Sequence, residues 1–526
     1  MPVWNFVRRS VYQDSVTLMR LTHDMEAVAG VRRAAAMMGT PANRVLLGQA
    51  GLLDAEGETA GPADLVIAVI ADDAPAAEAA RGAAEVALAA RQAARAPGAV
   101  RPRTLAGALR AQPDATLALI SVPGVYAGAE ARRALDAGLH VMLFSDNVPI
   151  ETEIELKRLA RERGRFLMGP DCGTALIAGV PLGFANAVPR GRIGLVAASG
   201  TGLQEVSCRL AAEGEGVSHA IGVGGRDLSD AVGGAMTLVA LSALAADPAT
   251  AVLVVIGKPP GRVVAARLAA VLQEMPKPVV FVGAGDASSG LEVGGPTERG
   301  AAPHVGVGRP HRAATLEDAA LAAVALARGE TPRAVEFSRP TPEIEQLVAA
   351  QAGPLVAGQR FVRGVYSGGT LAWEAVALLG ARLAQVAPGV GGDGAGHRVV
   401  DLGDDVFTLG RPHPMIDGAV RRERIVQDAA DPATAVLLLD VVLGYGAHPD
   451  PAAELLPALE TARGAGRAAG RGLAIVASVT GTERDPQVRS AQVAALRRAG
   501  VVVMDSNAQA ARLAALIAAR AAGLAS

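Results

Sequence analysis

Two turns rich in serine, threonine and glycine carry the residue types that bind anions. The first, ASGTGLQEV (198–206), follows the apolar run IGLVA and is expected to begin a helix. The first N–H groups of a helix have no partner inside it and lie at the positive end of the helix dipole, so they favour phosphate or carboxylate. SGGT (367–370) repeats the pattern, and an ordinary helix cap is the alternative for both turns. We expect the anion to be bound by Ser199, Gly200, Thr201, Gly202, Ser367, Gly368, Gly369 and Thr370.

Charged residues follow two strands that are expected in one sheet. IGVGGRDL (221–228) ends a strand with Gly224 and Gly225, which let a ligand approach the backbone closely, and then presents Arg226. Arginine can hold a carboxylate or phosphate through two N–H groups. Lys258 directly follows the apolar strand AVLVV, so it is expected near the same edge of the sheet. We therefore predict Arg226 and Lys258 as the catalytic cations, with a solvated lysine as the alternative for the latter.

Further polar residues lie in turns and in proline-flanked loops. Asp171 and Cys172 stand on a tight turn in MGPDCGTALIAG (168–179), at the carboxyl end of a predicted strand. Ligands of open α/β sheets bind at such ends, and a purely structural turn is the alternative. The loop histidines lack the spacing of metal ligands, so no metal site is predicted. Polar contacts to the ligand are also expected from Arg411, His413 and His448.

The elements that position these turns show an internal repeat. The nine residues AADPATAVL occur without a change at 245–253 and again at 429–437. In both copies they are expected to end a helix and begin a buried strand. One serine-glycine turn precedes each copy, and a Gly-Arg segment lies between the turn and the copy. Three landmarks in the same order indicate a duplicated domain.

The alternation of apolar strands with amphipathic helices predicts a multidomain α/β chain with parallel sheets. A length of 526 residues is too great for one core, and the Pro/Arg segment 95–103 and the charged segment 327–343 are predicted boundaries. The first strand is placed at VRRSVYQDSV (7–16). The predicted domains are a small α+β (ferredoxin-like) domain at 1–98, a Rossmann-like CoA-binding-type domain at 104–190, and two ligase-type flavodoxin-like domains at 191–330 and 345–526.

The composition excludes several classes of protein. Half of the residues are hydrophobic and 62 are glycine, which excludes a disordered chain. Lys plus Arg (50) nearly balance Asp plus Glu (52), so neither nucleic acid nor an anionic membrane is expected as a partner. The apolar runs are too short to cross a bilayer, and the N-terminus does not resemble a secretory signal. With only two cysteines, a protein of the reduced cytoplasm is expected.

Five long strings make the chain similar to a known family. They are MGPDCGTALIAG, IGLVAASGTGLQEV, GVSHAIGVGGRDLSDAVGG, GRPHPMID and LLLDVVLGYGAHPDP. On these strings the chain resembles the FdrA family over nearly its whole length. That family is related to the α subunit of succinyl-CoA synthetase, with a further ligase-type domain appended. For one characterised group the resemblance implies a subunit of oxamate carbamoyltransferase, which acts with other subunits in anaerobic allantoin breakdown, a branch of purine catabolism.

The chain departs from the synthetase pattern at three places. The synthetase has a phosphohistidine in a Gly-His-Ala-Gly loop, whereas the matching stretch VGAGDASSGLEVGG (282–295) has no histidine. His304 and His311 lie beyond that stretch. Lys258 replaces the glutamate that orients the phosphohistidine, and the glycine-rich CoA fingerprint is missing early in the second domain. Thioester formation through a phosphohistidine is therefore not expected, and no cofactor is assigned, with CoA as a disfavoured alternative.

The remaining residues suit the transfer of a carbamoyl group. The enzyme implied by the resemblance moves this group between oxalurate and phosphate, giving oxamate and carbamoyl phosphate. Such a transfer needs a phosphate site, donors for a carbonyl oxygen that gains charge, and a carboxylate clamp. We expect an oligomer with other carbamoyltransferase subunits that takes phosphate or carbamoyl phosphate as substrate. The alternatives are an acyl-CoA ligase subunit and a non-catalytic scaffold that binds an anionic metabolite.

Overall fold

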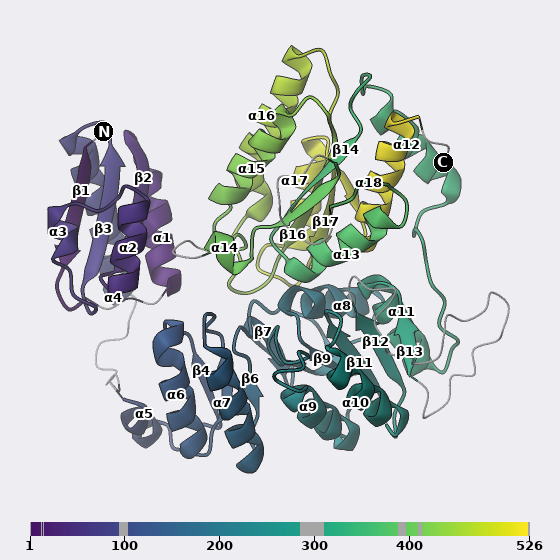
Figure 1. Ribbon diagram of the computed structural model, residues 1–526, viewed down its shortest axis with the longest axis horizontal. Helices are drawn as coiled ribbons and strands as arrows, with labels where there is room; N and C mark the ends of the chain where they lie inside the picture. Colours follow the sequence, from purple (N-terminus) through teal and green to yellow (C-terminus); the bar gives the residue numbers. More distant parts are fainter. Residues whose placement is uncertain are drawn as a thin grey trace. The chain divides into compact units, whose positions relative to one another are not determined.

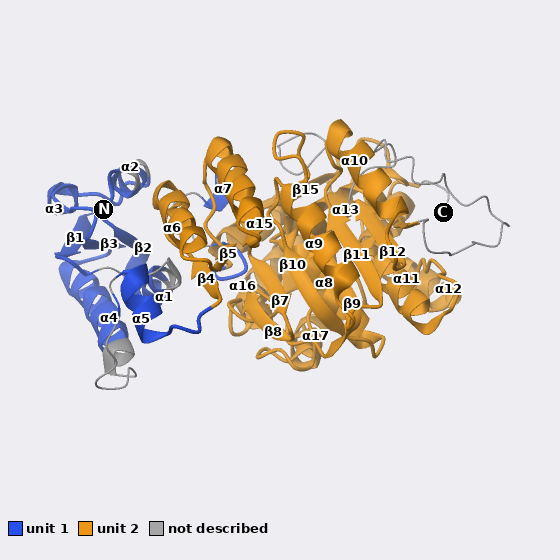
Figure 2. Cartoon of the chain, turned by 90° about the horizontal axis from the view of Figure 1, so that it is seen from below, with its two compact units in different colours: residues 1–115, 406–417 blue, residues 116–405, 418–526 orange. Residues whose placement is uncertain are grey.

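The computed structural model describes residues 2–11, 13, 15–93, 102, 104–283, 310–387, 396–408 and 413–523. The chain forms two compact units, one of residues 1–115 and 406–417 and one of residues 116–405 and 418–526 (Figure 2). Strands alternate with helices through most of the described chain (Figure 1), so the predicted multidomain α/β class is confirmed. No helix in the described ranges is long and apolar enough to cross a bilayer.

The N-terminal domain contains a three-stranded antiparallel sheet. β3 (Leu65–Ala71) lies at its centre, between β1 (Val3–Arg8) and β2 (Val31–Met38). The continuous apolar run of β3 explains this central place, since its first five residues are fully buried. The predicted strand 7–16 is wrong in its bounds, because Ser10 has a left-handed φ of 53° that ends the extended chain. The helices are α1 (Ser15–Glu26), α2 (Pro41–Gln49), α3 (Ala55–Glu58) and α4 (Ala74–Ala93), and α5 (Leu105–Ala111) belongs to the same unit.

The next domain is a small parallel sheet of βα units. Its strand order is β4 (Leu117–Ile120), β5 (His140–Leu143) and β6 (Leu167–Met168), with α6 (Gly124–Asp136) and α7 (Ile150–Glu162) as the crossovers. The buried ammonium of Lys157 on α7 lies 2.7 Å from carboxylate oxygens of both Glu153 and Asp227. Asp227 belongs to the following domain, so this buried group of charges joins the two domains.

The third domain, which the sequence predicts as the first of two ligase-type domains and which keeps that name below, is built on a seven-stranded sheet with the order β13-β12-β11-β9-β10-β7-β8. Strands β9 to β13 are parallel, and the hairpin β7–β8 is added antiparallel at one edge. β11 is buried along its whole length, as expected for a strand covered on both faces. The elements are β7 (Thr174–Ile177), β8 (Val180–Gly183), β9 (Arg190–Ala197), α8 (Gly200–Ala212), β10 (Val217–Gly222), α9 (Ala235–Ala246), β11 (Val252–Gly257), α10 (Arg262–Gln273), β12 (Val279–Gly283), β13 (His311–Ala313) and α11 (Leu316–Arg328).

The second ligase-type domain has a five-stranded parallel sheet with the order β15-β14-β16-β17-β18. Figure 1 shows α15 and α16 on one side of this sheet and α13 and α18 on the other. The elements are α12 (Thr341–Ala352), β14 (Phe361–Tyr366), α13 (Gly369–Gly380), β15 (Arg398–Asp401), α14 (Asp405–Thr408), α15 (Ala419–Ala430), β16 (Thr434–Val442), α16 (Pro451–Ala468), β17 (Ala474–Thr480), α17 (Arg489–Arg498), β18 (Val502–Met504) and α18 (Asn507–Ala521).

The two sheets share one topology, which accounts for the repeated nine residues. The order β10-β9-β11-β12-β13 in the first matches β15-β14-β16-β17-β18 in the second. Asp247 caps the end of α9 and accepts a hydrogen bond from Ala249 N at 3.0 Å. Asp431 caps the end of α15 and accepts one from Ala433 N at 2.9 Å. The repeated Asp-Pro-Ala-Thr therefore forms the same turn from helix to buried strand in both domains.

Buried polar contacts hold the helices of the two sheets together. The side chain of Glu205 on α8 accepts a hydrogen bond from Asn507 N at 3.3 Å, and that of Glu374 on α13 accepts one from Asn507 Nδ2 at 2.8 Å. Each glutamate is the sixth residue after the cap of its helix. Burial raises the pKa of Glu374 to about 7. Asn507 at the start of α18 therefore fixes α8 and α13 next to one another.

Candidate functional site

The start of α8 combines a side-chain cap with open backbone donors. Ser199 is the cap, and its Oγ accepts a hydrogen bond from Gly202 N at 2.9 Å. The N–H groups of Gly200 and Thr201, the first two of the helix, make no hydrogen bond within the described residues. Both residues are partly exposed. Two donors at the positive end of α8 are thus available to an anion.

The starts of α8 and α13 touch each other. Ser199 Oγ lies 2.5 Å from Thr370 Oγ1, so one hydroxyl donates to the other. A Cβ at Gly368 would lie 3.0 Å from Thr201 Oγ1, and one at Gly202 would lie 3.2 Å from Thr370 Cγ2. The structure therefore brings together five of the eight residues predicted to bind an anion. Their small size is required by the contact between the helices themselves.

The N–H groups of the two residues just before α13 are already used by a carboxylate of the protein. Asp440, on β16, accepts hydrogen bonds from Ser367 N at 2.9 Å and from Gly368 N at 2.8 Å. It also accepts one from Ser367 Oγ at 3.1 Å, and Arg421 Nη2 lies 3.0 Å from Asp440 Oδ1. Ser367 is buried together with this pair. An anion at this end would have to displace Asp440, so Ser367 and Gly368 are less suited to bind a ligand than the sequence predicts.

A second carboxylate, that of Asp401, lies beside the start of α13. It ends β15, and a Cβ placed on Gly369 would lie 2.5 Å from Asp401 Oδ2. Burial raises the pKa of Asp401 to about 6, while the positive charge of Lys258 acts in the opposite direction. Lys258 is exposed at the end of β11, as the sequence predicts. An exposed cation and a buried acid are therefore placed near the same helix starts.

Arg226 has a role in packing that its sequence position did not indicate. Its Nη2 lies 2.9 Å from Glu153 Oε2 and donates to the carbonyl of Val148 at 2.8 Å. Both partners belong to the preceding domain, in and next to α7. Gly224 has a φ of 88°, and a Cβ there would lie 2.3 Å from the carbonyl oxygen of Pro170. The Gly-Gly-Arg segment thus joins two domains. The guanidinium of Arg226 is already in contact with the protein, so it has fewer N–H groups available to a ligand.

The turn that carries Asp171 and Cys172 packs against the Gly-Gly-Arg segment. Cys172 is buried, and burial raises the pKa of its thiol to about 12. Its Sγ lies 3.4 Å from the carbonyl oxygen of Gly222, to which it donates. The thiol is therefore neutral and unsuited to contact a ligand or act as a nucleophile. Asp171 is exposed, and its Oδ2 lies 3.5 Å from where a Cβ of Gly225 would be.

The remaining predicted residues have local backbone contacts or lie outside the described residues. His448 Nδ1 accepts a hydrogen bond from Asp450 N at 3.0 Å, in the loop after β16. His413 Nδ1 accepts one from Met415 N at 3.2 Å, within the segment that belongs to the unit of the N-terminal domain. Arg411, His304 and nearly all of the 282–295 stretch lie outside the described residues.

Asp401 is the residue near these helix starts that the sequence reasoning missed. It is the last residue of a strand whose other residues read Arg-Val-Val. A signal was present, because polar residues at the carboxyl ends of parallel strands face the ligand side of a sheet. Its proximity to Gly369 depends on how β15 and α13 pack, which spacing along the chain does not reveal.

Comparison with known proteins identifies the parts of the chain. Residues 365–517 match the family model described as CoA-ligase, and residues 1–102 match the model described as AllF, heavy metal-associated domain. The chain is 37% identical over 513 residues to protein YahF of Escherichia coli (strain K12), covering 95% of this chain and 96% of YahF. It is 30% identical over 187 residues to the α subunit of ADP-forming succinate–CoA ligase from Staphylococcus aureus (strain N315), covering 34% of this chain and 60% of that subunit.

Two solved structures show a limited likeness to the chain. The apo form of the dinucleotide-forming acetyl-coenzyme A synthetase 1 of Ca. Korarchaeum cryptofilum is 16% identical, with a TM-score of 0.32 over 78% of this chain and 84% of that chain. ATP citrate lyase from Methanothrix soehngenii in complex with citrate and coenzyme A is 15% identical, with a TM-score of 0.35 over 62% of this chain and 56% of that chain.

The N-terminal domain does not have the donors that a heavy-metal site needs. The first 102 residues contain no cysteine, and their one histidine is His23. Soft metal ions are held by thiolates or by methionine thioethers. Thiolates are absent from this part of the sequence, and Met25 and Met38 are buried in its core. Across the part of the chain that the structure describes, no group of three or more His, Cys, Asp and Glu residues is placed to hold a metal ion. The residues therefore do not fit a soft metal in this domain.

Proposed function

The chain belongs to the family of Escherichia coli YahF, and from this premise we propose that it is a subunit of an acyl-CoA ligase-type enzyme that binds phosphate at the start of α8. One observation carries the proposal. The open N–H groups of Gly200 and Thr201 lie beside the hydroxyl pair of Ser199 and Thr370, where two ligase-type sheets meet. Two fixed donors at a helix start suit a phosphate oxygen.

The residues around this position fit chemistry that passes an acyl group to or from phosphate. The phosphate needs donors that are already oriented, and the carbonyl oxygen of the acyl group gains negative charge in the transition state. In the proposal α8 supplies the donors and Lys258 supplies positive charge. Asp401 has a pKa of about 6, which suits a group that gives and takes a proton near neutral pH.

A second candidate is the carbamoyl transfer implied by the FdrA resemblance. It is favoured by the match of residues 1–102 to the AllF domain model and by Lys258 in place of the synthetase glutamate. In this reaction a phosphate oxygen adds to the ureido carbonyl carbon of oxalurate. The C–N bond then breaks, and the nitrogen of the departing oxamate takes a proton, for which Asp401 in its neutral form is the proposed donor. The products are carbamoyl phosphate and oxamate.

Labelled substrates distinguish the candidates. Purified protein is incubated with ATP labelled at the γ-phosphate, and separately with oxalurate and phosphate together with its partner subunits. An acid-labile phosphoprotein supports the ligase. Phosphate-dependent formation of oxamate supports the transferase. Binding of phosphate without turnover in any combination of subunits supports a scaffold and contradicts both enzymatic candidates.

Two substitutions test the placement of the site in whichever reaction is found. Ser199→Ala removes the cap and the hydroxyl at the junction of the helices, and Lys258→Ala removes the exposed positive charge. Each is expected to lower kcat/KM about tenfold or more. Ser242→Ala on the exposed side of α9 is the matched control and should leave the rate unchanged. Unchanged rates in both site variants would contradict the assignment.

A further inference from the structure

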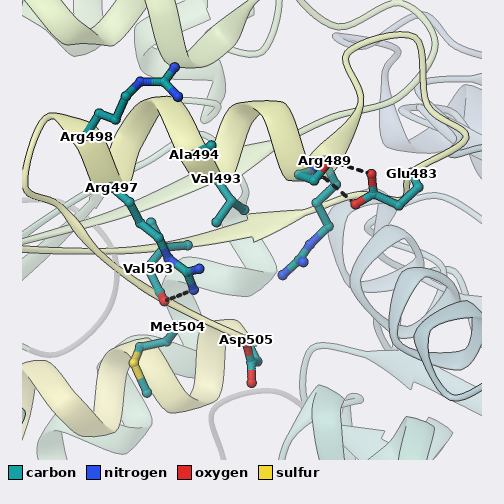
Figure 3. Close-up of a pocket in the computed structure, with 10 residues that line it drawn as sticks. Glu483, Arg489, Val493, Ala494, Arg497, Arg498, Val503, Met504 and Asp505 are labelled. Atoms are coloured by element: carbon teal, nitrogen blue, oxygen red, sulfur yellow. Dashed lines mark hydrogen bonds between the residues drawn. The ribbon is translucent and has the colours of Figure 1, made fainter.

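The pocket along α17 holds charges of both signs (Figure 3). Its lining places the carboxylates of Glu483 and Asp505 with the guanidinium groups of Arg489 and Arg497, whereas Arg498 extends away from them. A lining of mixed charge does not favour an anionic ligand over a cationic one. The start of α8 shows a clearer preference, because a buried hydroxyl lies beside its open N–H groups.

That hydroxyl belongs to Thr174, and it has no partner in the chain. Thr174 is the first residue of β7 and is only 1% exposed. Its Oγ1 makes no hydrogen bond within the described residues. The unpartnered side-chain atoms that the protein encloses completely do not include this oxygen, so the small exposed part of Thr174 contains it. Burying a hydroxyl without a partner costs stability, so this one is suited to a partner from outside the chain.

The hydroxyl of Thr174 faces the first residue of α8. A Cβ built on Gly200 would lie 3.3 Å from Thr174 Oγ1 and 4.0 Å from Thr174 Cβ, so the oxygen is the nearer of the two atoms. Apart from α8 itself and the residues next to Gly200, no other described residue reaches within 4 Å of that position. The space beside Gly200 is therefore open except for the hydroxyl, and the open N–H groups of Gly200 and Thr201 belong to the same turn.

The backbone of Thr174 is held firmly in place. Thr174 pairs with Gly183 in the antiparallel hairpin of β7 and β8. On its other side Gly222 of β10 packs so closely that a Cβ there would lie 2.4 Å from the carbonyl oxygen of Thr174. The hydroxyl is thus already positioned before a ligand arrives, as an effective donor must be.

We propose that Thr174 donates its hydroxyl to a tetrahedral oxyanion bound at the start of α8, as the third donor of that site. The inference rests on the proposed function, because it concerns the same phosphate. The N–H groups of a helix point along its axis, whereas a Cβ points away from the axis. The hydroxyl therefore approaches the ligand from a different direction than the two amides do. Donors from different directions fit a tetrahedral oxyanion better than the coplanar oxygens of a carboxylate.

Calorimetric titration of the full chain with inorganic phosphate tests the role of the hydroxyl. Thr174→Val keeps the shape of the side chain without the oxygen, and Thr174→Ser keeps the oxygen. The valine variant should bind phosphate about tenfold more weakly than the native protein, whereas the serine variant should retain most of the affinity. Because the hydroxyl has no partner in the chain, the valine variant should unfold at the same urea concentration as the native protein or at a higher one.

A second buried threonine provides the matched control. Thr250 Oγ1 lies 2.6 Å from both Ser218 Oγ and Asp247 Oδ2, with which it forms hydrogen bonds. Thr250→Val should therefore unfold at a lower urea concentration and leave the phosphate affinity unchanged. Oxalate, whose carboxylates are planar, should bind the native protein more weakly than phosphate does. Tighter binding of oxalate would contradict a site for a tetrahedral oxyanion.

The outcomes separate this inference from the proposed function. Unchanged phosphate affinity in Thr174→Val, or an equal loss in the valine and serine variants, would overturn the role of the hydroxyl. If phosphate binding is weakened by Gly200→Pro but not by Thr174→Val, this inference alone fails. Absence of phosphate binding by the native protein would contradict both.

Discussion

Within the described residues both domains leave the first two N–H groups of the helix without a hydrogen bond, those of Gly200 and Thr201 on α8 and those of Gly369 and Thr370 on α13. Only the second domain places a carboxylate beside its helix start, where Asp440 accepts hydrogen bonds from the N–H groups of Ser367 and Gly368, the two residues before α13.

Both domains have the same strand order, and both repeat AADPATAVL at the same turn. The repeat aligns Ile256 with Asp440, each eleven residues after the first alanine of its copy. One position of a duplicated strand is thus apolar in one domain and acidic in the other. A duplicated fold need not keep a duplicated site.

The contrast also explains why the two helix starts can touch. Two positive helix ends repel each other when both are bare, and a carboxylate at one of them removes this cost. Asp440 neutralises α13, and Arg421 in turn balances Asp440. The open donors of α8 have no such carboxylate beside them, which leaves the start of α8 the more positive of the two. Substitutions of Asp440 and Asp401 change the second domain, and substitutions of Gly200 change the first.

The largest effect is expected from Asp440→Asn. The substitution removes the carboxylate that Ser367, Gly368 and Arg421 contact, and it leaves the Arg421 charge buried without its partner. We expect the free energy of unfolding to fall by about 3–5 kcal/mol. Urea unfolding measures it, with Asp146→Asn at an exposed position as control. A loss no greater than in the control would show that Asp440 does not stabilise the second helix start.

A smaller and pH-dependent effect is expected from Asp401→Asn. Burial raises the pKa of Asp401 from 3.8 to about 6, so the folded protein holds this proton more tightly than the unfolded chain. Ionisation of the buried carboxyl therefore costs stability as the pH rises from about 4 to about 6, at most about 3 kcal/mol. Asparagine does not ionise.

The variant should accordingly be more stable than the native protein at about pH 8 and equal to it at about pH 4. Urea unfolding of both proteins at the two pH values gives the difference. A difference that does not change with pH would mean that Asp401 is not buried against α13 in the manner described.

The sequence predicted the parts of this molecule that depend on local pattern. Apolar runs and glycine-rich turns predicted the alternation of strands and helices, and the repeated nine residues predicted the duplicated domain. A helix cap was the alternative to anion binding for Ser199, and the structure shows that cap. Asp440 was visible as an acid in an apolar strand. Its contact with Ser367 was not predictable, because 73 residues separate them and only the packing of β14 against β16 brings them together.

Arg226 and Cys172 illustrate the same limit. Each has the chemistry of a functional residue, and each follows a strand at the edge where ligands bind. Arg226 instead contacts Glu153 across a domain boundary, and Cys172 lies in the core beneath Gly222. Their position at a strand end predicted the edge of the sheet on which these residues lie. It did not predict which residues their side chains contact, because those contacts depend on how the domains pack.

Phosphate binding by two variants at Gly200 tests the central claim most directly. Gly200→Pro removes one of the two open N–H groups, and proline is well tolerated at the first position of a helix. Gly200→Ala keeps the N–H and adds a Cβ that would lie 3.3 Å from Thr174 Oγ1. By calorimetry, the proline variant should bind phosphate about tenfold more weakly than the alanine variant. Equal affinities would show that the amide hydrogens of α8 do not hold the phosphate.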